Sequence, residues 1–243
     1  MAQDPVTNVL PLGDLYSPFF QISDVYSAIK NRQVIGVCAI YHAFSTPSIV
    51  LGTATQKVKQ TLVKKATSEI SDEFISLCQP NDIDLLKEYS TILHAHLEQQ
   101  MIADPPKKMD CGDIKVEKVR KNDLELLKKF YVDQQTEAWV PIQFKAGPYY
   151  CVKHEGKIVS AAGVHLVTPQ IAQLGNIFTD EAYRNRGFAT ACTNAVAADL
   201  ASKGRIISLF VRVDNPPAIH VYEGLGFYKA QDIAFLIMRK NEV

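Results

Sequence analysis

The segment YRNRGFAT, residues 183–190, joins two runs of different pattern, and this junction constrains the fold more than any other feature of the 243-residue chain. The preceding run AQLGNIFT (172–179) is typical of a β-strand. The following run FATACTNAVAADLASKG (188–204) places apolar residues at fourfold spacing and predicts a helix. A helix N-terminus presents unpaired backbone N–H groups and the positive end of the helix dipole. The junction is therefore a place where a phosphate could bind.

The residue types in the junction fit a phosphate site. Gly187 and Ala189 are small enough to let an anion approach the backbone, Arg184 and Arg186 add positive charge, and Thr190 offers a hydroxyl donor. An ordinary strand-to-helix turn with one glycine explains the same spacing equally well. The segment has neither a Gly-Lys-Ser/Thr ending nor the three glycines of a dinucleotide fingerprint, so hydrolysis of nucleoside triphosphates is not predicted.

Composition narrows the class of protein. With 47% apolar and 21% charged residues the chain can bury a core, and its 26 basic and 26 acidic residues give no long-range field to gather nucleic acid or an anionic membrane. No apolar run reaches the roughly 20 residues of a membrane-spanning helix. The cysteines form no C-x-x-C pair, which predicts neither disulfides nor a zinc site (Cys38, Cys78, Cys111, Cys151 and Cys192). We expect a cytoplasmic monomer or homodimer without nucleic-acid, membrane or metal partners.

The second half predicts strands and helices around the junction. Residues 114–119 are typical of a strand, and residues 122–135 of an amphipathic helix with Asn122 as its N-cap. Residues 148–167 predict two strands joined by a tight hairpin turn at Glu155-Gly156.

Beyond the junction helix, whose end is marked by Gly204, the segment RIISLFVRV (205–213) alternates as a half-buried strand. Asn215 is then placed to cap a short helix that has Pro216 at its first position. The predicted order is strand, helices, hairpin strands, strand, helix, strand, helix, strand.

The first half repeats this order more faintly. QVIGVCAIYHAFSTPSIVLGT (33–53) resembles KIVSAAGVHLVTPQIAQLGN (157–176), with a Thr-Pro at each corner. A helix (56–66), a strand (73–78) and a second capped helix (80–89) are predicted next. We infer an internal duplication. The first copy has no glycine between its strand and helix, so we expect one phosphate site, in the second copy.

A linker divides the halves. The segment ADPPKKMDCGD (103–113) combines consecutive prolines, charges and a glycine. We therefore predict an N-terminal domain at 1–105, a linker at 106–113 and a second domain at 114–243.

Two motifs in order give the second half a family resemblance. Residues 114–240 resemble the GNAT-type N-acetyltransferases, whose acetyl-CoA pyrophosphate loop reads Arg/Gln-x-x-Gly-x-Gly/Ala and stands here as RNRGFA (184–189). The later signature Asn-x-x-Ala-x-x-x-Tyr-x-x-x-Gly-Phe stands here as Asn215, Ala218, Tyr222, Gly226 and Phe227. The first half is similar to the degenerate partner domain of tandem members, including the glycine N-acyltransferase-like group, without a motif of its own.

The resemblance implies an α+β fold with a central, mostly antiparallel and splayed mixed sheet flanked by helices, preceded by a smaller degenerate GNAT-like domain. The strand before the loop and the strand at 206–213 would splay apart, with acetyl-CoA between them. Backbone amides from Arg186 to Thr190 would hold the pyrophosphate, and the strand at 176–179 would pair with the pantetheine arm. The implied cofactor-binding residues are Ile177, Phe178, Thr179, Arg184, Arg186, Gly187, Phe188, Ala189, Thr190, Asn215, Ala218 and Tyr222.

Tyr222 is the candidate general acid. It lies four residues after Ala218 and seven after Asn215, so a helix places the three on one face. A phenol of pKa about 10 is protonated at neutral pH and can donate to a leaving thiolate. Packing beneath the last strand would also explain Tyr222, and capping alone would explain Asn215.

The general base is less evident from the sequence. Many superfamily members carry a glutamate eleven residues before the first motif residue, and this position is Gln173, which cannot accept a proton. Glu137 and His165 are the alternatives, together with a bound water, and we name Glu137 as the catalytic candidate. The missing glutamate favours an acceptor of low pKa, near 7.7 for an α-amino group rather than about 10.4 for a lysine-like amine.

Several aromatic and histidine residues have an ordinary structural explanation as well as a functional one. Trp139, Tyr149 and Tyr150 fall where the family places acceptor-side walls, and core packing explains them equally well. His94 and His96 stand two apart, but no third ligand is spaced to complete a metal site.

The sequence thus predicts an acetyl-CoA-dependent N-acetyltransferase that transfers an acyl group directly to an amine, with a small molecule as the acceptor. A non-catalytic acyl-CoA-binding sensor or scaffold, and a protein N-acetyltransferase, are the alternatives.

Overall fold

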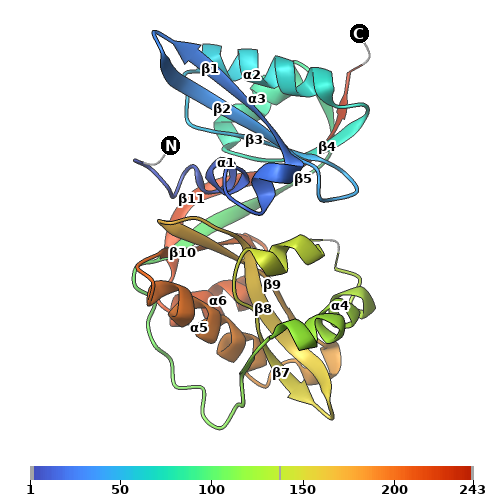
Figure 1. The fold of residues 1–243 in the computed structure, drawn as a ribbon, viewed down its shortest axis with the longest axis vertical. Helices are drawn as coiled ribbons and strands as arrows, with labels where there is room; N and C mark the ends of the chain where they lie inside the picture. Colours follow the sequence, from blue (N-terminus) through green and yellow to red (C-terminus); the bar gives the residue numbers. More distant parts are fainter. Residues whose placement is uncertain (1–2, 137, 242–243) are drawn as a thin grey trace. The chain divides into compact units, whose positions relative to one another are not determined.

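A computed structural model describes residues 3–136 and 138–241 (Figure 1), so the expected base Glu137 lies outside the described residues. The chain forms two compact units. Unit 1 comprises Met1–Gln100 and Gln231–Val243, and unit 2 comprises Met101–Ala230. Each unit has its own apolar core.

Unit 1 consists of a sheet with short helices at its start and two helices between its strands. Its elements are α1 (Val9–Asp14), η1 (Phe19–Ile22), β1 (Ser23–Lys30), β2 (Gln33–Tyr41), β3 (Ser48–Leu51), α2 (Gln56–Glu69), β4 (Glu73–Cys78), η2 (Pro80–Asp82), α3 (Ile83–Lys87) and most of β5 (Ser90–Ala103) and β11 (Tyr228–Lys240). The strand order is β1-β2-β3-β4-β11-β5. β3 runs parallel to β4, and the other pairs from β1 to β3 are antiparallel.

Unit 2 repeats this plan. Its elements are β6 (Glu117–Lys118), η3 (Lys121–Asp123), α4 (Leu124–Asp133), η4 (Pro141–Lys145), β7 (Tyr150–His154), β8 (Lys157–Val167), β9 (Ile171–Thr179), η5 (Glu181–Tyr183), α5 (Phe188–Ala201), β10 (Ile206–Arg212) and α6 (Pro216–Gly224). The strand order is β10-β9-β8-β7-β6, with only β10 and β9 parallel. The expected mixed, mostly antiparallel sheet with flanking helices is confirmed for this unit.

Local signals predicted several elements of unit 2 correctly. The hairpin turns at Glu155 and Gly156, whose φ angles of 48° and 77° are those of a two-residue turn between antiparallel strands. Gly204 has a φ of 73° just after α5, as the end of a helix requires. Asn215 caps α6 by accepting a hydrogen bond from the Ala218 N–H. The half-buried strand expected at 205–213 is confirmed as β10: Ile207, Leu209 and Val211 are buried, whereas the opposite face is buried only at Ser208.

Other local predictions were wrong. Asn122 is not an N-cap, because it lies inside η3; the Asp123 carboxylate instead accepts a hydrogen bond from the Arg120 N–H at 2.9 Å. The strand expected over 114–119 is only Glu117–Lys118.

The end of the chain does not stay with the second half. β11 pairs antiparallel with β4, from Ala234 opposite Cys78 to Arg239 opposite Glu73, so residues 231–243 group with unit 1. This division differs from the expected domain at 114–243. Its cause is the long-range pairing of β11, which no local pattern reports.

Candidate active site

The junction between β9 and α5 has an irregular backbone that brings N–H groups together. After η5, Asn185 and Gly187 adopt left-handed φ angles of 62° and 76°. Gly187 is the N-cap of α5 and offers no side chain to cap it. A Cβ added at Gly187 would have one close neighbour, the Ile114 Cδ1 at 3.3 Å, so the conformation rather than crowding explains the glycine.

The backbone N–H groups of residues 186–190 form no hydrogen bond with the described part of the chain. The first helical bond of α5 runs from the Ala191 N–H to the Gly187 carbonyl at 3.0 Å. A helix N-terminus with unpaired N–H groups and no side-chain cap favours an anion. The junction therefore has the donors that a pyrophosphate requires.

Both arginines are held close to this backbone. The Arg184 guanidinium donates from Nε to the Thr179 carbonyl at 3.3 Å, pairs with Glu181 at 3.1 Å and lies over the Phe178 ring. The Arg186 Nη2 donates to the Ala182 carbonyl at 3.1 Å. A guanidinium has five N–H groups, so each arginine retains donors that an anion could accept.

β9 loses one neighbour halfway along its length. It pairs with β10 only from Ile171 opposite Ile206 to Leu174 opposite Leu209, whereas its pairing with β8 continues to Thr179. Residues 175–179, which include Ile177, Phe178 and Thr179, therefore have an edge that no strand pairs within unit 2. An extended ligand can add to such an edge through backbone hydrogen bonds.

Asn176 marks the point where the strands separate, and sequence reasoning missed it. Its φ of 55° coincides with a register shift between β9 and β8, and its side-chain Nδ2 donates to the Gln143 Oε1 and the Tyr149 hydroxyl, both at 2.9 Å. The Tyr131 hydroxyl donates to the Asn176 carbonyl at 2.6 Å. The only signal in the sequence was an asparagine inside a strand pattern, because asparagine tolerates a positive φ.

The second motif places Tyr222 on α6. Tyr222 is 8% exposed, and burial raises the pKa of its phenol to about 12. Among the described residues its hydroxyl has no hydrogen-bond partner. The Asn215 side chain is engaged by the Ala218 N–H at 3.3 Å, and both residues lie in the first turn of the helix.

The expected base position holds a buried amide. Gln173 is 1% exposed, and neither its Nε2 nor its Oε1 has a partner in the described chain. His165 is half-buried as a whole, but its Nε2 is buried and unpartnered, and burial lowers its pKa to about 4. Trp139 and Tyr149 are buried on this side of the sheet, whereas the Tyr150 hydroxyl donates to Asp199 of α5.

The residues that the structure describes contain neither a membrane-spanning helix nor a cluster of metal ligands. No helix among them is both long and apolar enough to cross a membrane. No three His, Cys, Asp or Glu side chains within residues 3–136 and 138–241 gather as a metal site would require. His96 instead contacts His94 at 3.4 Å and Glu98 at 3.1 Å.

Comparison with known sequences points to one family. Residues 121–227 match the family model described as the acetyltransferase (GNAT) family. An uncharacterized N-acetyltransferase of Methanocaldococcus jannaschii is 39% identical to this chain over 59 residues, which are 24% of the chain. The chain spans 26% of the length of that curated relative.

Solved structures share the fold over most of the chain. A GNAT-family protein from Novosphingobium aromaticivorans has a TM-score of 0.69 at 20% identity and covers 98% of this chain and 97% of its own. A GCN5-related N-acetyltransferase-like protein from Streptococcus suis has a TM-score of 0.65 at 15% identity, with 98% and 97% covered. A tandem GNAT protein from the clavulanic acid biosynthesis pathway has a TM-score of 0.57 at 12% identity, with 95% and 87% covered.

At these identities the structural likeness shows the fold. The family model shows that residues 121–227 are similar to the GNAT acetyltransferase family.

Proposed function

We propose that this chain is an acetyl-CoA-dependent N-acetyltransferase whose active site lies in unit 2 and whose acceptor is a small amine. One observation carries the proposal. The unpaired N–H groups of residues 186–190 follow the unpaired edge of β9, residues 175–179, with only the short η5 segment between them. A phosphate group joined to an extended, amide-containing arm fits this order of binding features.

The residues present fit acetyl-CoA. The N–H groups at the start of α5 would hold the pyrophosphate, with charge added by Arg184 and Arg186. The edge at Ile177, Phe178 and Thr179 would pair with the pantetheine amides, and a backbone N–H near Phe178 would meet the thioester oxygen. When bound, acetyl-CoA supplies an activated acetyl group as a thioester. Phe188, Ala189, Thr190, Asn215 and Ala218 complete the proposed cofactor site.

The transfer would form the new C–N bond as the C–S bond breaks, so the amine loses a proton and the sulfur gains one. Tyr222 is the proposed donor to the sulfur. Its pKa of about 12 keeps the phenol protonated, but makes it a weaker acid than a thiol of pKa about 8.5. We therefore propose that Tyr222 hydrogen-bonds the sulfur as charge develops there, rather than acidifying it in advance.

Glu137 stays the proposed base, outside the described residues. Gln173 cannot remove a proton, and the low pKa of His165 makes it a weak acceptor for an ammonium proton. An acceptor that is largely unprotonated at neutral pH suits these surroundings.

Release of CoA thiol from acetyl-CoA, measured with a panel of primary amines, tests the proposal. We expect amine-dependent release that follows Michaelis–Menten kinetics and an acetylated product of matching amount. Thiol release at the same rate without amine would show only hydrolysis and would contradict the proposal.

The buried Gln173 in the usual base position favours one second candidate, a non-catalytic acyl-CoA-binding sensor. Calorimetry that shows CoA binding, combined with no turnover of any amine, would support the sensor instead. A protein acceptor is a further possibility, which peptide substrates in the same panel would reveal. The cytoplasmic location and the degenerate role of unit 1 are part of the proposal.

A further inference from the structure

Three of the five residues whose buried polar side-chain atoms lack a partner in the described chain belong to one layer of unit 2. Within the described chain such atoms occur in Tyr41, Trp139, His165, Gln173 and Thr193. Leaving a buried donor or acceptor unpaired costs about 1–3 kcal/mol, so several of them in one place need an explanation. Trp139, His165 and Gln173 lie in the same layer, between the sheet and α4.

The two faces of the sheet can be distinguished along β8. Ala161 pairs with Phe178, whose ring contacts Phe130 of α4 at a centroid distance of 6.1 Å. Ala162 pairs with Tyr150, whose hydroxyl donates to Asp199 of α5 at 3.1 Å. Successive strand residues point to opposite faces, so α4 and α5 cover opposite faces of the sheet.

Gln173 and His165 lie on the α4 face. Gly175 pairs with Gly163, which shares the face of Ala161, and Gln173 is two residues from Gly175 on the same strand. The His165 ring crosses Gly175 so closely that an added Cβ would lie 2.2 Å from its Cδ2. Gln173 also stands one residue before Leu174, the last β9 residue that pairs with β10.

Trp139 belongs to the same layer. Its ring stacks on Tyr131 of α4 at 5.1 Å, and the Tyr131 hydroxyl donates to the Asn176 carbonyl at the separation point. The three side chains are uncharged at neutral pH, because the indole and the amide do not titrate and burial lowers the pKa of His165 to about 4, outweighing a hydrogen bond with Asn176 that raises it. Such groups select neutral hydrogen-bonding partners rather than a charge.

We propose that the acceptor is an α-amino amide, meaning an amino-acid amide or a peptide N-terminus, and that Gln173 is the residue that recognises its amide. The inference rests on the proposed acetyltransferase function. A glutamine side chain offers an N–H donor and a carbonyl acceptor, which complement the carbonyl and N–H of an amide in two hydrogen bonds. The indole N–H of Trp139 and the Nε2 of His165 provide further polar contacts in the same layer.

The chemistry of the amine agrees with this assignment. An α-amino group has a pKa of about 7.7, whereas an alkylamine of the lysine type has about 10.4. A large share of the α-amino groups is therefore uncharged at neutral pH. This suits a site in which a glutamine stands where many relatives carry a glutamate.

The test compares glycinamide, glycylglycinamide, glycine and propylamine as acceptors, with kcat/KM corrected for the uncharged fraction of each amine. We expect the two amides to exceed propylamine and glycine by about 10-fold. Gln173→Met should lower kcat/KM for the amides about 10-fold and leave propylamine within about 2-fold. The control Thr193→Val removes another unpartnered buried atom, on α5, and should leave this selectivity unchanged.

The relative rates of the two amides show which acceptor the site recognises. Equal rates indicate that the site binds a single amide group, and a preference for glycylglycinamide indicates that it binds a peptide N-terminus. Wild-type preference for glycine or propylamine would overturn the proposal without any variant. An equal loss for all amines in Gln173→Met, or in Gln173→Leu should the first variant not fold, would assign Gln173 a structural role and overturn the proposal too. No turnover of any amine would instead reject the acetyltransferase function itself.

Discussion

Helices α2 and α5 hold corresponding places in the two units, but the side chains around their N-termini differ. Each helix has 14 residues and joins two strands that pair in parallel, β3 to β4 and β9 to β10. The segment before α5 contains two arginines and leaves the first N–H groups of the helix unpaired. The segment before α2, GTAT (52–55), is shorter and meets the polar side chains of its own unit.

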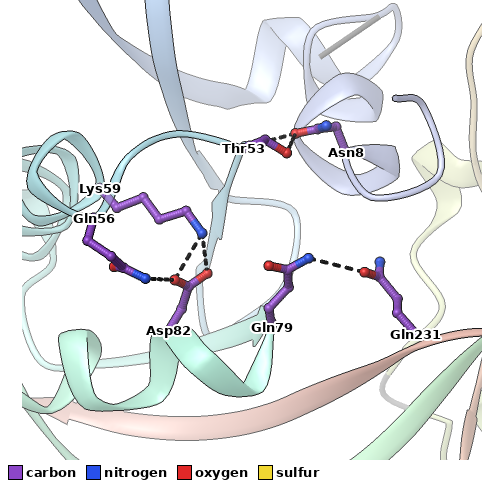
Figure 2. A network of polar contacts seen from close by, with 7 residues as sticks. All are labelled: Asn8, Thr53, Gln56, Lys59, Gln79, Asp82 and Gln231. Carbon is purple, nitrogen blue, oxygen red and sulfur yellow. Dashed lines mark hydrogen bonds and ion pairs between the residues drawn. The ribbon is translucent and has the colours of Figure 1, made fainter. Parts of the chain in front are cut away.

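A polar network of unit 1 lies beside the start of α2 (Figure 2). The Asn8 Oδ1 accepts hydrogen bonds from the N–H and the hydroxyl of Thr53, at 2.7 and 3.1 Å. In the first turn of α2, Lys59 pairs with Asp82 at 2.7 Å, and Gln56 donates to the same carboxylate at 3.3 Å. The Asp82 carboxylate thus lies beside the first turn of α2, and a carboxylate near a helix N-terminus is stabilised by the helix dipole.

The segment of unit 1 that corresponds to the second motif also differs from its counterpart in unit 2. Gln79 precedes Pro80 at the start of η2, as Asn215 precedes Pro216 at the start of α6, but its amide donates to Gln231 at 3.1 Å. Six residues after the proline, unit 2 has Tyr222 and unit 1 has the fully buried Leu86. These differences agree with our assignment of the proposed chemistry to unit 2.

Removing the buried ion pair of unit 1 should have the largest effect, and this effect should be confined to stability. Lys59→Met leaves the Asp82 carboxylate, 2% exposed, without its cation, so we expect a loss of about 3–5 kcal/mol in the free energy of unfolding. Urea denaturation measures this loss. Lys65→Met, which removes an exposed ion pair with Glu69 from the same helix, should change the free energy by less than about 1 kcal/mol. Similar values for the two variants would show that the network does not hold unit 1 together.

Removing the Tyr222 hydroxyl should slow catalysis in unit 2; unit 1 has Leu86 at the corresponding position. Tyr222→Phe keeps the ring but loses the donor to the sulfur, so we expect kcat to fall about 100-fold while the affinity for CoA is unchanged. Steady-state kinetics and calorimetry give the two quantities. The exposed Tyr228→Phe serves as the matched control and should retain full activity. An unchanged kcat in Tyr222→Phe would remove this residue from the mechanism.

The stability of unit 1 should also depend on pH through Asp14. Burial raises the pKa of Asp14 to about 7, whereas an unfolded aspartate titrates near 3.9. Between these values the folded state holds the proton more tightly, so stability falls as pH rises from about 4 to 7. Asp14→Asn should match the wild type at pH 4 and exceed its free energy of unfolding by up to about 4 kcal/mol at pH 8. An equal gain at both pH values, or a gain in the control Asp24→Asn, would exclude titration of Asp14 as the cause.

Sequence reasoning succeeded where the determinant is local. The turn at Glu155-Gly156, the Asn215 cap and the glycine before α5 each follow from the backbone angles that their residue types favour. It failed where distant segments meet. The pairing of β11 with β4 and the burial of Lys59, which stands in a lysine-rich helix, depend on contacts that no local window contains. The left-handed Asn176 could not be located for the same reason.

We propose above all that the N-terminus of α5 binds the pyrophosphate of CoA, and calorimetric titration with CoA tests this most directly. Gly187→Ala places a side chain at a φ of 76° in the anion site, so we expect CoA affinity to fall about 10-fold. Gly204→Ala puts similar strain, at a φ of 73°, at the far end of the same helix and should bind CoA as the wild type does. Equal affinities for the wild type and both variants, or no CoA binding at all, would contradict the account.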